Sequence, residues 1–444
     1  MTFARRSSRI GSVKYECRLL SKSDETVRVG TESKKHHYVP QSILRRFSIG
    51  GRARHVFVFD KASGHQRRES IVKTGMENHF NTVVVGGARE NFEHLFDRVD
   101  SAFAGVHSRL LEHRNTKQIG AADWLNLTDG VAAQLLRTKL YRTTLIAVGE
   151  NLARAFAKCG PVEPPVERID EQTARASARD AVLEREKIRV SIASKRLLLI
   201  EPEVGGEFWV SDNPVVQHNT LAYGDLGLNA RGIEIYFPVA RDLVLGFFCP
   251  TIAARVSKAR ALGDRLDEPL KSQCADLDEA FVTGRPTQLS AKGASAFLNE
   301  LQVRYASRFI YSAQNDFSLV TTILIADPSV RNVQSLIEGG MLGEASSCRS
   351  SMPSGLYLVV LGHEDNYMLP IDEIDAGHTW GFDVLVHDGR TVEAMIKDQP
   401  WDQVRVYQDG RERRAMRRIR GEAVREAARW RVKIRQDLEI LAAQ

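Results

Sequence analysis

The segment around residue 36 combines, at close spacing, side chains that can do acid–base or metal chemistry. His36 and His37 are adjacent, Pro40 follows, and Arg45 and Arg46 come one helical turn later. An imidazole near a helix N-terminus binds a metal as the neutral base or donates to a phosphate as the cation, and the free amides of that turn favour an anion. Adjacent residues on an extended backbone point to opposite sides, so at most one histidine faces a given site. The alternative is that one histidine caps the helix and the other packs in the core.

A second candidate is the string FWVSDNP, which runs from Phe208 to Pro214 and contains Asp212 and Asn213. Carboxylates at strand ends are common metal ligands or general bases, because the strand fixes the backbone and the loop exposes the oxygens. The same string also fits an Asx-turn, in which the Asp212 oxygen accepts backbone amides and Asn213 takes the extended conformation that Pro214 demands. Both interpretations stay open.

Two predicted helices carry further polar side chains on one face. Gln134 and Arg137 share a face of the first, and Arg137 is able to pair with a phosphate or with a buried carboxylate such as Asp212. Asn299 and Gln302, three residues apart, share a face of the second, where their amides can hold a loop backbone or orient a ligand. For all four residues, a structural role in a solvated face or a hydrogen-bond network is the alternative.

These candidates suggest hydrolysis of phosphodiesters. One hypothesis is a metal-assisted phosphodiesterase or nuclease of a defence or toxin type, in which a divalent metal is the expected cofactor although its ligands are unknown. The strings GxxxxGK[ST], GxGxxG, HExxH and GxSxG are absent, which disfavours the common NTPase, dehydrogenase, zincin and hydrolase classes. The alternative is a non-catalytic module that binds nucleic acid or protein. The catalytic candidates are His36, His37, Asp212 and Arg137, and the polar support comes from Gln134, Asn213, Asn299 and Gln302.

Hydrophobic spacing predicts the elements that position these side chains. A short helix begins at Pro40, and a strand runs over residues 55–60. Apolar residues at three- and four-residue steps predict helices over about 90–111 and 121–151, and a polar helix extends to about Lys195. The first half of the chain is therefore predicted to be mainly helical.

After Lys195, short β-type runs replace the long helices, although helices return at about 277–283 and 291–307. Helices followed by mixed strands favour the α+β class, with the helical first half packed on a mixed β-sheet. The strand-type runs cover residues 197–200, 208–210, 233–237, 243–248 and 319–325.

Composition predicts a cytoplasmic protein without a membrane span. No run of about 18 apolar residues occurs, and the first 20 residues lack the continuous apolar core of a secretory signal. The five cysteines are widely spaced, which fits reduced thiols. The net charge of +6 divides into +5 for residues 1–35, +8 for residues 411–435 and −7 for the rest, so basic ends flank an acidic body.

The basic C-terminal segment is predicted to be an amphipathic helix that docks by a narrow apolar stripe and presents its basic face to nucleic acid. The protein's own acidic surface and a protein partner are the competing partners. The predicted nucleic-acid contacts are Arg413, Arg414, Arg417, Arg418, Arg425 and Arg429. The predicted parts of the chain are a flexible basic tail (1–33), a core domain (34–330), a linker (331–353), a small C-terminal α/β extension (354–408) and the basic helix (409–444).

Six strings occur in a fixed order: KKHHYVPQSILRRF, VFVFDKASG, ENHFNT, QLLRTKLYR, FWVSDNPVV and LNELQVRYASRFIYS. In that order and with these separations, they resemble the bacterial domain-of-unknown-function family numbered 4238, over about residues 34–312. The resemblance implies no reaction or cofactor. It marks the histidine pair, the Asp-Asn-Pro turn and the Asn-x-x-Gln helix as candidate sites.

Overall fold

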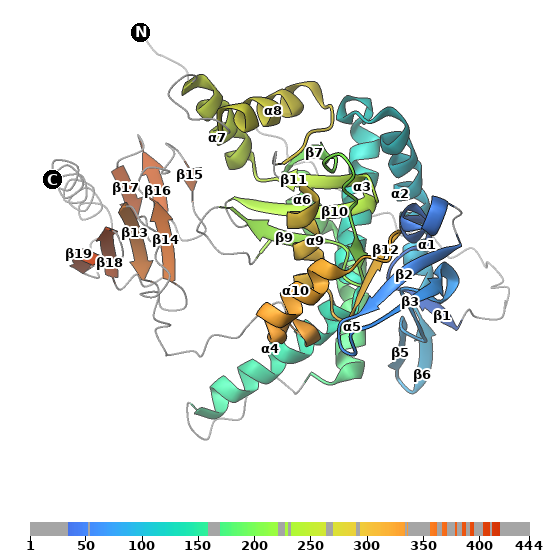
Figure 1. Cartoon of the computed structure of the whole chain (residues 1–444). Coiled ribbons are helices and arrows are strands. Elements are labelled where there is room, and N and C mark those ends of the chain that lie inside the picture. Colours follow the sequence, from blue (N-terminus) through green and yellow to red (C-terminus); the bar gives the residue numbers. More distant parts are fainter. Residues whose placement is uncertain are drawn as a thin grey trace, which may run out of the picture. The chain divides into compact units, whose positions relative to one another are not determined.

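The structure is a computed structural model (Figure 1). It describes residues 34–51, 54–158, 169–220, 227–229, 232–262, 270–289, 294–333 and 335, together with seven strands between residues 356 and 417. The predicted tail 1–33 and residues 418–444, with Arg418, Arg425 and Arg429, lie outside the described residues, as does most of the predicted linker. The boundaries predicted for these parts stay predictions, which limited proteolysis would test.

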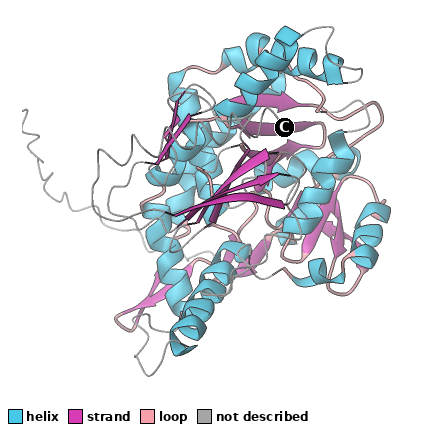
Figure 2. Cartoon of the chain, turned by 90° about the vertical axis from the view of Figure 1, so that its left-hand side faces the viewer, coloured by secondary structure: helices cyan, strands magenta, loops and turns pink. Residues whose placement is uncertain are grey.

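A four-stranded antiparallel sheet, in the order β7-β11-β10-β9, forms the centre of the core. Every residue of β10 (Ile233–Ala240) and β11 (Leu243–Phe248) is buried, as their nearly continuous apolar sequences predict for strands covered on both faces. The flanking strands are β7 (Arg196–Ile200) and β9 (Val216–Asn219). Figure 2 shows the strands in magenta and the helices in cyan.

Helices cover the two faces of this sheet. On one face, Phe237 of β10 stacks on Phe103 of α2 (His94–His113), and Phe247 of β11 contacts Trp124 of α3 (Ala121–Leu136). On the other, Phe248 contacts Phe281 of α8 (Leu270–Thr283), and Tyr236 contacts Phe297 of α9 (Ala294–Tyr305). Because side chains alternate along a strand, odd-numbered aromatics meet α2 and α3 and even-numbered ones meet α8 and α9.

A second four-stranded sheet, in the order β3-β2-β12-β8, joins the two ends of the core. The hairpin of β2 (His55–Asp60) and β3 (His65–Ser70) pairs through β2 with β12 (Phe309–Ser312), where Asp60 lies opposite Phe309. β8 (Val210–Ser211) pairs with the other edge of β12. The sheet therefore brings together segments from the start, middle and end of the core.

Two small pairings complete the N-terminal part. β1 (Lys35–His37) pairs with β4 (Met76–Asn78), and β5 (Thr82–Val85) forms a hairpin with β6 (Ala88–Asn91). The predicted short helix at Pro40 is confirmed as α1 (Gln41–Leu44) and a 3₁₀ turn, η1 (Arg45–Phe47), in which Ile43, Leu44 and Phe47 are buried. The other helices are α4 (Lys139–Lys158), α5 (Glu171–Leu183), α6 (Glu186–Ala193), α7 (Pro250–Leu262) and α10 (Ser318–Ala326).

Two predictions of secondary structure were wrong in the core. The run 319–325, predicted as a strand, belongs to helix α10, in which Val320, Ile323 and Leu324 are buried and Ile325 is exposed. That three- and four-residue spacing is helical, and a short apolar run does not separate the two possibilities. The single helix predicted over 121–151 is two helices, because α3 ends at Leu136 and α4 begins at Lys139.

The described part of the C-terminal extension consists of strands. The sheets have the orders β14-β13-β18-β19 and β15-β16-β17. Their strands are β13 (Leu356–Leu361), β14 (Asn366–Pro370), β15 (His378–Thr379), β16 (Val384–His387), β17 (Thr391–Ala394), β18 (Gln403–Gln408) and β19 (Arg411–Arg417).

The start of the predicted basic helix is strand β19, so Arg413, Arg414 and Arg417 lie on a strand. Gln408 of β18 pairs with Arg411 of β19. The two residues between them in the sequence are Asp and Gly, the pair most typical of a two-residue β-hairpin connection. The helical spacing of apolar residues further on concealed this signal.

Antiparallel sheets and segregated helices confirm the α+β class. None of the helices in the described part of the chain combines the length and the apolarity that a membrane span needs.

Candidate functional site

The pairing of β1 with β4 separates the two histidines as alternation predicts. His36 lies opposite Glu77 and is fully buried, whereas His37 is half-buried. The His36 ring accepts a hydrogen bond at Nδ1 from the backbone N–H of Asn81, at 2.8 Å. Since Nδ1 accepts, the neutral ring carries its hydrogen on Nε2. His36 is thereby fixed between β1 and the segment that follows β4.

Asn81 is fully buried and connects three segments. Its Nδ2 donates to Glu93 Oε2, and its Oδ1 accepts from the Arg142 guanidinium. A buried amide needs such partners, because an unpaired polar group in the interior costs about 1 to 3 kcal/mol. Asn81 therefore sets the position of the Glu93 carboxyl relative to His36.

Glu93 lies at the N-terminal end of α2 and is half-buried. The backbone N–H of His37 lies 3.4 Å from its Oε1. Burial raises the pKa of Glu93, while the Asn81 hydrogen bond and the nearby charges of His36 and Arg137 oppose that rise. Glu93 is thus a carboxyl that holds its proton to higher pH than an exposed one.

His37 is shifted in the other direction. Burial lowers its pKa, and the charges of Lys35 and His36 lower it further, while a hydrogen bond to the Val72 backbone raises it. Gln41 Nε2 lies 3.3 Å from His37 Nε2. Donation from the amide to Nε2, with the ring hydrogen on Nδ1 facing Val72, fits both contacts. His37 is then a neutral imidazole whose Nε2 lone pair is held only by a long contact.

Two buried guanidiniums complete the surroundings of Glu93. Arg142 donates to the Phe80 carbonyl, and its guanidinium carbon lies 3.5 Å from the centre of the Phe80 ring. Burial lowers the Arg142 pKa to about 9. Arg137 forms a bidentate ion pair with Asp100. Arg137 was expected to bind a phosphate or Asp212, and the structure gives it Asp100 instead because it ends α3 beside α2.

We call His36, His37, Asn81, Glu93, Arg137 and Arg142 the His37–Glu93 cluster. It brings together three sequence-predicted residues, His36, His37 and Arg137. Sequence reasoning missed Glu93, Asn81 and Arg142, although the strings ENHFNT and QLLRTKLYR contain the last two. Gln134 lies on α3, where its Nε2 donates to the Tyr38 carbonyl at 2.8 Å, so it holds the chain next to His37.

Asp212 lies on other elements and serves the backbone. It is buried, and its two oxygens accept the N–H groups of Ser307, Arg308 and Phe309 at 2.8 to 2.9 Å. Burial raises the Asp212 pKa, and these three amides oppose that rise. The amides come from the turn between α9 and β12, which is distant in sequence, rather than from a local Asx-turn.

The amides of α9 also hold loop backbone, which is one of the two roles predicted for them. Asn299 accepts the Trp209 N–H at 2.7 Å and donates to the Glu207 carbonyl at 2.9 Å. Gln302 accepts the Ser211 N–H at 2.9 Å and donates to the Pro214 carbonyl at 3.0 Å. Together they fix the backbone on both sides of β8. Asn213 is buried in the same turn, where its N–H lies 3.2 Å from Ser211 Oγ.

Three further charged groups, Lys61, Arg308 and Asp60, join Asp212. Lys61 is fully buried, and its ammonium donates to the carbonyls of Val303, Ala306 and Val330 at 2.6 to 2.7 Å. Burial lowers its pKa to about 8, and the charge of Asp212 opposes this shift. The Arg308 guanidinium forms a bidentate pair with the Asp60 carboxylate, which lowers the pKa of Asp60. We call Asp60, Lys61, Asp212 and Arg308 the Asp212 cluster.

No group of three or more His, Cys, Asp or Glu side chains is placed to hold a metal ion among the described residues. Within the His37–Glu93 cluster, Glu93 is the one carboxyl group, and His36 uses Nδ1 to accept a backbone hydrogen bond. A metal bound by protein ligands alone is therefore not built into this cluster as it stands.

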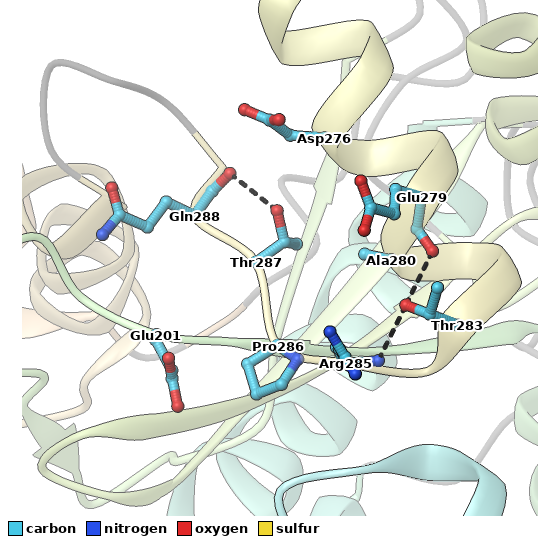
Figure 3. Close-up of a pocket in the computed structure, with 9 residues that line it drawn as sticks. All are labelled: Glu201, Asp276, Glu279, Ala280, Thr283, Arg285, Pro286, Thr287 and Gln288. Atoms are coloured by element: carbon cyan, nitrogen blue, oxygen red, sulfur yellow. Dashed lines mark hydrogen bonds between the residues drawn. The ribbon is translucent and has the colours of Figure 1, made fainter.

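A separate pocket of about 370 Å³ is lined by α8 and the segment that follows it (Figure 3). Asp276 and Glu279 project from α8, and Glu201 forms the opposite wall with an ion pair to Arg114. Arg285 is the basic group on this wall. Carboxylates outnumber it, so the pocket suits a cation or a polyol better than a phosphate.

The comparisons with known proteins give a family and nothing narrower. The family described as "Protein of unknown function (DUF4238)" matches residues 35–316, which is more than half of the chain. The chain belongs to this family. No match was found among curated proteins or solved structures. Both polar clusters of this DUF4238 chain lie within the matched residues.

Proposed function

We propose that the chain is a phosphodiester hydrolase of the nuclease type, with His37 as general base and Glu93 as general acid. One observation carries the proposal: three segments far apart in sequence place His36, His37, Asn81, Arg137 and Arg142 around a single half-buried carboxyl, Glu93. Such convergence of an imidazole, a carboxyl and guanidiniums is typical of sites that transfer protons.

The two titrating groups suit opposite roles. His37 is held neutral by its lowered pKa and is able to take a proton from an attacking water at Nε2. Burial raises the pKa of Glu93, so this carboxyl keeps its proton to higher pH than an exposed one and is able to give it to the leaving oxygen. The water oxygen bonds to phosphorus as the bond to the leaving oxygen breaks. Solvent then returns His37 and Glu93 to their starting protonation states.

The flanking residues support an anionic substrate. Arg45 and Arg46 are exposed on η1, next to the helix that carries Gln41. Arg45 donates to Gln41 Oε1 at 3.1 Å, so Arg45, Gln41 and His37 form a row. A phosphate that binds Arg45 would compete for this contact and release Gln41 from His37 Nε2. The substrate would then take the place of the Gln41 side-chain amide, which now contacts His37 Nε2.

A divalent ion is a second form of the same proposal. Mg²⁺ is commonly held by one or two protein carboxylates together with substrate phosphates, and Glu93 is the carboxylate available here. The two forms differ in one measurement. Acid–base catalysis by His37 and Glu93 alone predicts cleavage in EDTA. Loss of cleavage in EDTA, with recovery in Mg²⁺ or Mn²⁺, would make Glu93 a ligand rather than an acid.

The test is cleavage of single- and double-stranded DNA and RNA by the full chain, with and without Mg²⁺. We expect His37→Ala and Glu93→Gln each to lower the rate by about 100-fold or more, the usual contribution of a general acid or base. His94→Ala is the matched control, because His94 is an exposed imidazole beside Glu93. No cleavage of any substrate by the wild-type chain, or full activity in both variants, would refute the proposal.

The second candidate is a module that binds nucleic acid or protein without catalysis. It is favoured by the contacts of Asp212, Asn299 and Gln302, which serve the backbone as a structural role requires. Strand β19 supplies Arg413, Arg414 and Arg417 as basic groups for such a partner. Binding of oligonucleotides that is retained in His37→Ala, without cleavage by the wild-type chain, would support this alternative.

A further inference from the structure

A pocket of about 800 Å³ lies where the turn η2 (Ile49–Gly51) meets the β2–β3 hairpin. Its described lining consists of Ile49, Gly50, Arg54, His55 and Arg68. Three of these five residues are basic and none is acidic. The volume lies within the range of small-molecule sites, about 300 to 1,000 Å³.

The sheet fixes the positions of the basic residues. The Arg54 carbonyl accepts the Ile71 N–H at 3.0 Å, which extends the ladder beyond the end of β2. Arg68 lies on β3, opposite Phe57. Both side chains therefore leave a backbone that is held by inter-strand hydrogen bonds, and a ligand would not have to order the chain.

The guanidiniums of Arg54 and Arg68 differ from that of Arg67, which neighbours Arg68 on β3. Arg67 pairs with Glu69 at 2.7 Å and lies over the Phe309 ring, so its charge already has a partner. No carboxylate in the described part of the chain forms an ion pair with Arg54 or Arg68. Uncompensated positive charge in a concave wall attracts anions, because the field of each group adds to that of the other.

The basic side chains of the pocket supply hydrogen-bond donors. Arg68 Nη2 lies 3.3 Å from His55 Nδ1, a contact in which the guanidinium donates and the neutral imidazole keeps its hydrogen on Nε2. Gly50 has φ 59° and ψ 21°, and nothing lies within 4 Å of the place where its Cβ would be. A ligand is thus able to approach the backbone of this turn closely.

We propose that this pocket is a binding site for a phosphate group. Arginine matches phosphate with two parallel N–H donors, and two arginines with an imidazole N–H suit a group of high charge such as a diphosphate or a terminal phosphomonoester. The site is separate from the acid–base pair and does not depend on it. The chemistry fits both a free phosphorylated molecule and the 5′-phosphate of a nucleic acid.

The test measures binding to the full chain by calorimetry. The probes are inorganic pyrophosphate and a pair of short DNA oligonucleotides with a 5′-phosphate or a 5′-hydroxyl. The variant is Arg54→Ala with Arg68→Ala, and the matched control is Arg67→Ala, which removes an arginine from the same strand but outside the pocket. Thermal melting checks that both variants stay folded, which is expected because Arg54 and Arg68 are exposed.

We expect the double variant to bind pyrophosphate at least about tenfold more weakly, since two charge-assisted contacts are lost, and the control to bind as the wild type does. Tighter binding of the 5′-phosphorylated oligonucleotide would identify a nucleic-acid end as the source of the phosphate. Equal binding of both oligonucleotides would favour a free phosphorylated molecule. The proposal is wrong if the wild type does not bind pyrophosphate at millimolar concentration, or if the double variant retains wild-type affinity.

Discussion

The two polar clusters of this domain use similar residues and differ in how far their hydrogen bonds are satisfied. In the Asp212 cluster, Asp212 accepts three amides, Lys61 donates to three carbonyls, and Asp60 pairs with Arg308 through both oxygens. In the His37–Glu93 cluster, Arg137 Nε and Arg142 Nε are buried without a partner among the described residues. Beside the two clusters, Gln134 Oε1 and Asn213 Nδ2 are also without one.

The difference indicates that the Asp212 cluster supports the fold and that the His37–Glu93 cluster is the candidate for chemistry. A fully satisfied network gains nothing from a ligand, and it makes the surrounding backbone rigid. Buried groups without partners, next to a carboxyl and an imidazole with opposite pKa shifts, are more typical of a place where something binds. The sequence offered Asp212 and the histidines as one site, and the structure assigns them to these two different environments.

The strongest test of this distinction is Lys61→Met. The change removes an ammonium and leaves the carbonyls of Val303, Ala306 and Val330 buried without a donor. We expect a loss of about 3 to 5 kcal/mol in the free energy of unfolding, measured by denaturant titration. Lys73→Met, at an exposed lysine, is the control and is expected to change little. A stable Lys61→Met protein would show that the Asp212 cluster is not the support we describe.

Asp212→Ala is expected to come next in size. Three backbone amides lose a charged acceptor, so we expect a loss of about 3 kcal/mol or more in unfolding free energy. Any activity of the variant should fall only in proportion to the folded fraction, because Asp212 takes no part in the proposed chemistry. Asp97→Ala, at an exposed position of α2, is the control. A stable Asp212→Ala variant without activity would return Asp212 to the catalytic site.

The pH dependence of activity sharpens the assignment of roles. His37 must be neutral and its pKa is lowered below 6.5, so activity should fall as pH drops through that lowered value. Glu93 must be protonated and its pKa is raised above 4.5, so activity should also fall as pH rises through the raised value. We expect a bell-shaped profile with a mildly acidic optimum, each limb changing about tenfold per pH unit. A profile that is flat from pH 4 to 8 would exclude this pair.

The smallest expected effect concerns Glu93→Gln and stability. A carboxyl whose pKa is raised in the folded state stabilises below its ordinary value of 4.5, and that contribution is lost as pH rises through the raised value. Relative to Gln, the wild-type chain should therefore become less stable as pH increases from about 4.5. Melting temperatures at several pH values measure this difference. Glu112→Gln, at an exposed position of α2, is the control.

Much of the fold could be predicted because its signals are local. The apolar runs of β10 and β11 and the stripe of α2 identify themselves by spacing alone. The predictions for residues 319–325 and 411–417 were wrong. A short apolar run fits helix and strand alike, and the apolar stripe predicted for a basic helix outweighed the Asp-Gly pair before residue 411. In both segments, the helix pattern and the strand pattern each depend on neighbouring residues. Only packing against the rest of the chain decides between them.

The site was less predictable because it depends on contacts between distant segments. His36, His37 and Arg137 were found from their residue types. Glu93 was missed because the residues around it in the sequence do not show that β1 pairs with β4. Asn81 follows β4 and donates hydrogen bonds to both His36 and Glu93. Asp212 was singled out by its residue type, but its backbone partners become adjacent only when β12 pairs with β8.

Chemical labelling of Lys61 also measures how often the domain opens. A lysine whose ammonium is enclosed by three carbonyls cannot react with an acylating reagent in the folded chain, whereas exposed lysines such as Lys73 react at once. Modification of Lys61 therefore requires that the turn after α9 and the η6 segment (Pro328–Asn332) separate from β2. Followed by mass spectrometry over time, the labelling of this one amine reports how often the two ends of the core come apart.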